Sequence, residues 1–297
     1  MQKALEQMNI QLHKVISDIT GVTGMRIIKA ILDGQRDRLE LAKLKDRRIR
    51  SSVDRIAKAL DGDYRPEHLF ALRQAVELYD IYYQKIAQCD EQIEQYLIRL
   101  ASKISPPNQA LPPDKRSSSK RRRQEPGFDL RAHLFHLTGV DFTQIEGFSV
   151  LTIQTILSEV GLNASRFPTE KHFVSWLGLC PENRITGGKI KSSHTRRIKN
   201  RAANAFRLAA QGVINSNGPM GTLYRRLRAR LGPAQAITAT AHKLARIFYR
   251  LWRDPDAYDP THIEHHEQQN TQRTIDYLKK KARSLGFQLV PQPTAGL

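Results

Sequence analysis

The chain has 297 residues, in which 48 Lys and Arg stand against 29 Asp and Glu, and its formal net charge is +19. A hydrophobic content of 40% is enough for a buried core, so disorder along the whole chain is excluded. No apolar run reaches the roughly 18 residues of a membrane span, the start lacks the apolar stretch of a signal peptide, and two cysteines exclude a disulfide framework. We therefore expect a cytoplasmic protein with no membrane partner.

Residues 1–104 are dominated by helical periodicity and are predicted to form a helical coiled-coil region. Pro66 suits the first turn of a helix, and the apolar spacing after it predicts a helix of roughly 38 residues, too long for an ordinary globular domain. Its heptad positions are Leu69, Leu72, Val76, Tyr79, Tyr83, Ile86, Ile93, Leu97 and Leu100. The stretch from Leu5 to Ile19 is expected to pack antiparallel to it in a helical hairpin, through turns at Gly21 and Gly24 and a shorter helix. Periodicity leaves open whether these stripes form a core within one chain or the interface of a homo-oligomer.

Residues 105–127 change in character and are predicted to be a flexible linker. They contain two proline pairs, three consecutive serines and a run of Lys and Arg. Such a composition buries too little apolar surface to become ordered by itself. Two readings of the basic run remain open, a solvated tether and a contact with nucleic acid.

A compact helical unit is expected to follow, starting from a tight hairpin at residues 145–149. This hairpin leads into an apolar helix from Val150 to Val160, closed by Gly161. A hairpin of this kind can present backbone N–H groups to a DNA phosphate without reading sequence. Gly147 and Ser149 are therefore candidate DNA-binding residues.

The most informative segment is 183–253, because it holds sixteen Lys or Arg and no Asp or Glu. A local excess of one sign predicts an anionic partner, and nucleic acid fits this pattern best. With no carboxylates, the segment alone cannot build a metal site, and its candidate nucleophiles are hydroxyls among cations. The candidate DNA-binding residues are Arg184, Gly187, Gly188, Lys189, Lys191, Arg196, Arg197, Lys199, Arg201, Arg225 and Arg226.

Residues 254–297 are expected to form a helical tail. The predicted fold class is therefore all-α, with a long coiled-coil helical hairpin followed by a small basic domain, residues 128–253, that holds a helix-hairpin-helix-like element. No metal site is predicted in the chain.

Several of these pieces together resemble the C-terminal domain of bacterial insertion-sequence transposases of the DEDD type, the family of insertion sequence one-hundred-and-ten. The matching residues are Ile145 to Val150, Phe173 to Pro181, Ile185 to Lys189, Asn200 to Arg207, Ala239 to Arg246 and Leu285 to Phe287. Residues 1–104 are similar to the coiled-coil region of the same family.

The resemblance implies an RNA-guided DNA recombinase that cleaves and exchanges DNA strands. In that family a hydroxyl before paired glycines attacks DNA, and that position here is Thr186 in place of the usual serine. Ser192 and Ser193 are the fallback nucleophiles. The resemblance also implies DNA as a partner, a guide RNA as a further candidate partner, and a nucleoid-associated location.

The family's metal-binding, resolvase-like (RuvC-type) domain is not recognised in this sequence. No β-branched strand run precedes the helical pattern, so the chain is expected to lack that domain and to be inactive alone. Mg²⁺ is expected only together with a complete resolvase-like domain. The alternative is a non-catalytic nucleic-acid-binding regulator or scaffold derived from a transposase.

Overall fold

The computed structural model describes residues 1–107, 109–114, 125–192, 194–196, 198–254, 272, 275–288 and 290. The chain divides into two compact units, Met1–Glu91 and Gln92–Leu297. Both are built mainly from helices, so the all-α prediction is confirmed, apart from one two-stranded hairpin in the second unit. None of the described helices is both long and apolar enough to cross a membrane.

The first unit is a small helical globule. Its elements in chain order are α1 (Gln2–Gln7), the 3-10 turn η1 (Leu12–Lys14), α2 (Val22–Leu32), α3 (Arg38–Lys43), α4 (Val53–Ala59) and the start of α5 (Pro66–Ala101). The core of the unit gathers apolar side chains from all of these elements, including Leu5, Ile28, Leu41, Ile56 and Leu72. The 36 residues of α5 confirm the predicted long helix.

The predicted helical hairpin is wrong for its first arm. Residues 1–20 form only the short α1 and the η1 turn, because Asn9 takes a left-handed conformation with φ 59° directly after α1. Main-chain bonds then tie this turn to later residues, from Gln11 N to Ala59 O (2.8 Å) and from Asp63 N to Met8 O (2.8 Å). The apolar residues whose spacing suggested a helical stripe therefore fill the core of a globule.

In its described part, the second unit packs eight helical elements and the end of α5 around one aromatic core. The elements after α5 are α6 (Leu130–Thr138), η2 (Phe142–Gln144), α7 (Val150–Val160), η3 (Ala164–Arg166), α8 (Glu170–Trp176), β1 (Arg184–Thr186), β2 (Lys189–Ser192), α9 (Arg201–Gly212), α10 (Pro219–Leu231) and α11 (Pro233–Arg253). Prolines open α10 and α11, where the missing N–H removes no helix bond.

The 21-residue α11 is the centre of this unit, since it packs on α8, α9 and α10. Its Phe248 is fully buried and stacks on Phe142 with ring centroids 4.3 Å apart. The polar ends of two buried rings are satisfied, because Tyr249 Oη donates to Phe167 O (2.6 Å) and Trp252 Nε1 donates to the Leu162 carbonyl (3.2 Å). The core therefore fixes the helices that carry most of the basic residues.

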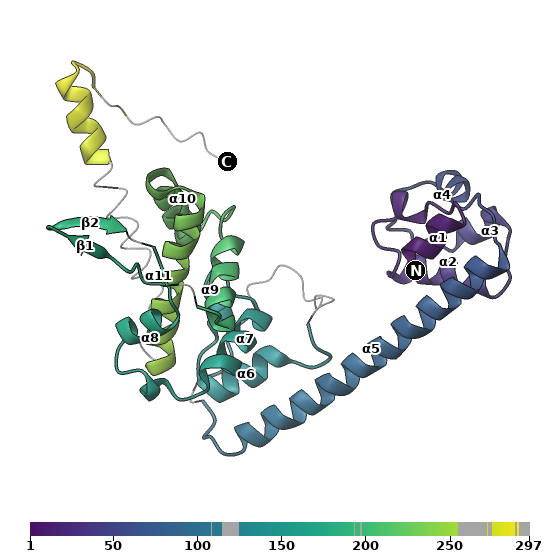
Figure 1. The fold of residues 1–297 in the computed structure, drawn as a ribbon, viewed down its shortest axis with the longest axis horizontal. Helices are drawn as coiled ribbons and strands as arrows, with labels where there is room; N and C mark the ends of the chain where they lie inside the picture. The colour runs from purple at the N-terminus through teal and green to yellow at the C-terminus, as the bar shows by residue number, and fades with distance from the viewer. Residues whose placement is uncertain are drawn as a thin grey trace. The chain divides into compact units, whose positions relative to one another are not determined.

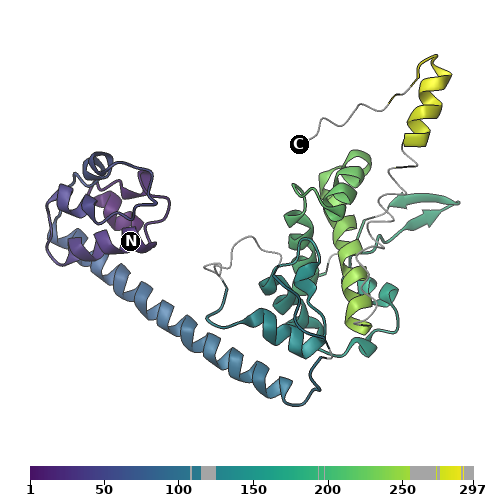
Figure 2. The same cartoon turned by 180° about the vertical axis from the view of Figure 1, so that it is seen from behind.

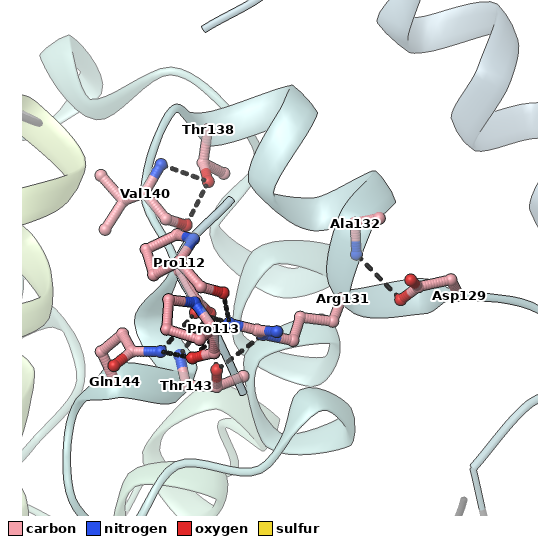
Figure 3. A network of polar contacts seen from close by, with 10 residues as sticks. Pro112, Pro113, Asp129, Arg131, Ala132, Thr138, Val140, Thr143 and Gln144 are labelled. Carbon is pink, nitrogen blue, oxygen red and sulfur yellow. Dashed lines mark hydrogen bonds and ion pairs between the residues drawn. The ribbon is translucent and has the colours of Figure 1, made fainter. Parts of the chain in front are cut away.

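A buried ion pair fixes the corner that leads into α7, as Figure 3 shows. The Arg131 guanidinium on α6 binds the Asp141 carboxylate, and it also donates to Pro112 O (2.7 Å). Gln144 Nε2 donates to Pro113 O (3.1 Å) and to Asp141 Oδ2 (2.9 Å). The network thus holds residues 112–113, part of the predicted linker, onto the helical unit. Residues 108 and 115–124 of that linker lie outside the described part of the chain.

Candidate nucleic-acid interface

The predicted nucleophile lies on a β-hairpin that projects from the helices of the second unit, as Figures 1 and 2 show. Strands β1 and β2 are antiparallel, with Thr186 opposite Lys189 and Ile185 opposite Ile190. Gly187 and Gly188 form the turn with φ 56° and 72°, a conformation that favours glycine at both positions. The hairpin therefore places a hydroxyl directly before its tip.

The pleat of the hairpin decides which side chains share a face. Directly opposed residues lie on the same face with Cβ atoms roughly 4.5–5.5 Å apart, and residues two apart on one strand also share a face. Thr186 and Lys189, which are directly opposed, therefore lie on one face, and both are exposed, as is Lys191 at the register shift between Arg184 and Ile185. One hydroxyl and one ammonium group are thus presented together, with a second exposed lysine on the same strand.

The fallback nucleophile Ser192 is placed differently. It is half-buried and pairs with Arg184 beyond the register shift, and its hydroxyl oxygen accepts a long hydrogen bond from His194 N (3.5 Å). Ser193, Arg197 and the side chain of Arg184 lie outside the described part of the structure. Of the two described hydroxyls on the strands, Thr186 is thus the exposed one, and it lies directly opposite a lysine.

The base of the hairpin is anchored to α8. Pro181 and Thr195 form a bridge, and Glu182 N donates to His194 O (2.9 Å). Arg196 donates to both Ser175 O (2.9 Å) and Ser175 Oγ (3.0 Å). Arg196 is exposed, so it holds the hairpin base while its charge remains open to solvent.

Burial and nearby cations shift the pKa of three titratable groups in this part of the unit. Burial raises the pKa of the Cys180 thiol, and the charges of Arg196 and Arg246 act in the opposite direction. Burial also lowers the pKa of His242, with a further lowering from Arg246. A hydrogen bond from Arg246 lowers the pKa of Glu170 on α8, so this carboxylate is charged and paired at neutral pH.

The cations of the helices differ in how they are engaged. Arg201 at the start of α9 pairs with Glu159 of α7 (3.2 Å), and Arg225 on α10 donates to Ser216 O (2.6 Å). Arg226 and Lys199 are exposed. Two carboxylates from outside the acid-free segment, Glu159 and Glu170, thus each pair with one of its sixteen cations in the described structure.

A cationic stripe on α11 was not among the predicted site residues. Its buried positions face the aromatic core, so the residues between them share the exposed side. The stripe is formed by Lys243, Arg246, Arg250 and Arg253. Their i, i+3, i+7 and i+10 spacing was the sequence signal that could have identified it.

The predicted helix-hairpin-helix element faces inward. Gly147 has φ 93°, and a Cβ there would lie 2.6 Å from Ala209 O of α9, so the turn packs closely on that helix. Ser149 caps α7 by accepting from Thr152 N (3.2 Å). Glu146 Oε2 accepts from Met220 N at the start of α10 (2.9 Å). These groups hold the unit together, and their role in DNA binding stays a prediction.

The arrangement defines a helical domain that carries a hydroxyl on an exposed, cation-rich hairpin. Residues 141–225 match the family model described as "Transposase IS116/IS110/IS902 family". This region is therefore similar to the transposases of that family, so the resemblance to the family is confirmed for it, whereas the DEDD type and the lack of a resolvase-like domain stay predictions.

A relative with a similar sequence is the "Insertion element IS110 uncharacterized 43.6 kDa protein" of Streptomyces coelicolor. The two sequences are 31% identical over 119 residues, which make up 39% of this chain and 29% of the relative. The match thus spans less than a third of the relative's length. No solved structure matches the chain.

Proposed function

We propose that this protein is an insertion-sequence transposase that binds DNA and takes part in strand cleavage and exchange. The observation that carries the proposal is the exposed hairpin inside the region that matches the transposase family model, where Thr186 lies directly opposite Lys189. Phosphoryl transfer needs a positioned nucleophile and fixed positive charge for the phosphate oxygens. The hairpin supplies both groups.

The proposed step is the attack of the Thr186 hydroxyl oxygen on a DNA phosphorus atom. An oxygen–phosphorus bond to Thr186 forms, the bond from phosphorus to one sugar oxygen breaks, and that sugar oxygen is released. The hydroxyl proton leaves to solvent, and the released oxygen takes up a proton. Attack by a strand-end hydroxyl on the threonine phosphoester then rejoins DNA and restores the enzyme, so no external energy source is needed.

The surrounding cations are proposed to hold the DNA during this step. Lys189 would bind the scissile phosphate from the same face as the hydroxyl, and the exposed Lys191 would add a further positive charge on the hairpin. Arg196 at the hairpin base and the α11 stripe would follow the backbone on either side. Threonine is stiffer than serine at χ1, because its β-carbon is branched, so the geometry of the turn sets where the oxygen points.

A metal-binding half-site is implied by the resemblance but does not fit the described residues. Among them, no group of three or more His, Cys, Asp and Glu side chains is placed to hold a metal ion. We therefore propose that cleavage requires a resolvase-like domain with Mg²⁺, supplied together with this chain, and that a guide RNA takes part in the complete assembly.

The long helix α5 is proposed to assemble two copies of the chain as a coiled coil. Several apolar side chains in its middle turns are exposed, among them Tyr83 (64%) and Ile86 (59%), both at heptad positions. Exposed apolar residues at heptad spacing are typical of a coiled-coil seam.

The test is a covalent-adduct assay with end-labelled DNA, Mg²⁺ and a separately supplied resolvase-like domain. We expect a protein–DNA adduct on a denaturing gel that Thr186→Ala abolishes, Thr186→Ser retains, and the matched control Ser192→Ala leaves unchanged. DNA affinity should be unaffected by Thr186→Ala. If no adduct forms although DNA still binds, the non-catalytic regulator or scaffold is the correct function.

A further inference from the structure

The first unit carries a compact basic segment of its own, which runs from the end of α3 through the connecting loop into α4. Residues 43–58 hold seven Lys or Arg and two Asp, whereas the rest of residues 1–91 hold nine Lys or Arg and twelve Asp or Glu. All of the positive excess of this unit therefore lies in one stretch of sixteen residues, here called the basic loop. It is distant in sequence from the transposase domain.

The basic loop is pinned to the globule at both ends. Asp46 N donates to Thr23 Oγ1 of α2 (2.9 Å), and Ser51 Oγ donates to the Val15 carbonyl (2.7 Å). Lys45 closes the loop from within, because its Nζ donates to Ile49 O (3.3 Å) and Ser51 O (2.7 Å). A loop held in this way presents its remaining side chains in a fixed arrangement.

The remaining cations of the basic loop point to solvent. A turn closed by a bond from Ile49 N to Asp46 O (2.9 Å) puts Arg47 and Arg48 at its tip. Arg48 is engaged by both oxygens of Asp46, at 2.8 and 3.2 Å.

Arg47, Arg50 and Arg55 are exposed, and their side chains make no hydrogen bond or ion pair with any residue in the described part of the chain. Three guanidinium groups are thus free to bind an anion. Isolated exposed arginines are common on proteins, but here three lie within nine residues, two before α4 and one in its first turn, in a segment whose seven cations outnumber its two acids.

We propose that the basic loop is a second nucleic-acid contact, which binds the phosphate backbone of duplex DNA. Guanidinium groups bind phosphate oxygens with two parallel N–H bonds. Residues 43–58 contain no aromatic side chain, so they offer no platform on which unpaired bases could stack. The choice of DNA over RNA rests on the proposed function.

The salt dependence of binding measures this contact directly. Each phosphate contact adds about 0.9 to the slope of log affinity against log salt, so three contacts add roughly 2.7. Between about 50 and 200 mM salt, the parent chain should then lose about 40-fold more affinity than a chain without them. The variant is Arg47→Ala with Arg50→Ala and Arg55→Ala in the full chain, measured by fluorescence anisotropy on a fixed DNA duplex.

A matched control separates a contact from a general loss of charge. Lys3→Ala with Lys85→Ala and Lys103→Ala removes the same number of charges from exposed positions outside the basic loop. We expect this control to keep the parent slope. Replacing the same three arginines by lysine keeps their charge and should restore most of the slope, which also shows that the loop still folds.

The outcomes separate this proposal from the proposed function. The proposal is overturned if the slope falls equally in the arginine-to-alanine variant and in the control in which Lys3, Lys85 and Lys103 are replaced by alanine. It is also overturned if the slope changes with duplex RNA of the same sequence but not with DNA. Lys189→Ala with Lys191→Ala tests the hairpin independently. If only that variant changes binding, the basic loop is not a contact, whereas if only the loop variant changes binding, the proposed role of the hairpin fails and the loop contact stands.

Discussion

Replacing Asp141 by Asn should destabilise the second unit by about 3–5 kcal/mol, the typical cost of removing one partner of a buried ion pair. The side chains of Asp141 and Arg131 are only 3% and 10% exposed. Besides Arg131, the carboxylate accepts from Thr143 N (3.1 Å), Thr143 Oγ1 (2.6 Å) and Gln144 Nε2 (2.9 Å). An amide cannot accept from all these donors, and it leaves the buried guanidinium without a counter-charge.

Urea unfolding followed by tryptophan fluorescence measures this loss. Both tryptophans, Trp176 and Trp252, lie in the second unit, so the signal reports that unit alone. The matched control is Glu159→Gln, which breaks the more exposed pair with Arg201 and should cost about 0–1 kcal/mol. A loss no larger than in the control would refute the stabilising role of the network.

The same pair predicts a pH dependence. Burial acts to raise the pKa of Asp141, but hydrogen bonds from Arg131, Thr143 and Gln144 outweigh it and hold the pKa below its ordinary value of 3.8. The contribution to stability is therefore complete above that value and is lost as the pH falls from it toward the lower folded-state pKa. The difference in unfolding free energy between wild type and Asp141→Asn should shrink over that acidic range and stay constant at higher pH.

Three further substitutions test the packing and the hairpin. Gly147→Ala should lower the free energy of unfolding by at least about 1–2 kcal/mol, because φ is positive there and a Cβ would lie 2.6 Å from a carbonyl oxygen of α9; urea unfolding measures it. Tyr249→Phe should cost about 1–3 kcal/mol by leaving the buried Phe167 carbonyl without its donor, and the same assay applies. Gly188→Ala, at φ 72°, should strain the turn by about 1–2 kcal/mol and reduce the adduct yield while global stability is unchanged.

Helix positions were predictable where their signals are local. The start of α5 at Pro66 and the end of α7 at Gly161 follow from the backbone preferences of single residues. The conformation of the first arm of the supposed helical hairpin was not predictable, since the apolar spacing of residues 5–19 suits a compact core as well as a helix. What decides between them is the left-handed turn at Asn9 and its long-range bonds to Ala59 and Asp63, which no short window contains.

The chemistry of the site was predictable as a set of residues but not as an arrangement. The Gly-Gly pair between two short alternating segments is a hairpin signal, and without the strands the faces could not be assigned. The sequence treats the hydroxyls of Thr186 and Ser192 alike, but the structure distinguishes them, because Thr186 is exposed and opposite Lys189 whereas Ser192 is half-buried and opposite Arg184. The basic loop was missed for a different reason: charge summed over residues 1–104 gives +3, which hides a local excess among acids elsewhere in the globule.

The exposed position of the hairpin bears on how Thr186 is controlled. An isolated two-stranded hairpin is at best marginally stable in water, and Ile185 on this one is 62% exposed. The order of the hairpin must therefore come from its base, where Arg196 binds Ser175 and Pro181 pairs with Thr195. Since Arg196 is also a cation available to DNA, binding of the backbone at the base and orientation of the hydroxyl at the tip depend on the same side chain. Under the proposed function, a phosphate that engages Arg196 would thus act on the anchor of the hairpin, and this coupling would give bound DNA a route to position the Thr186 hydroxyl.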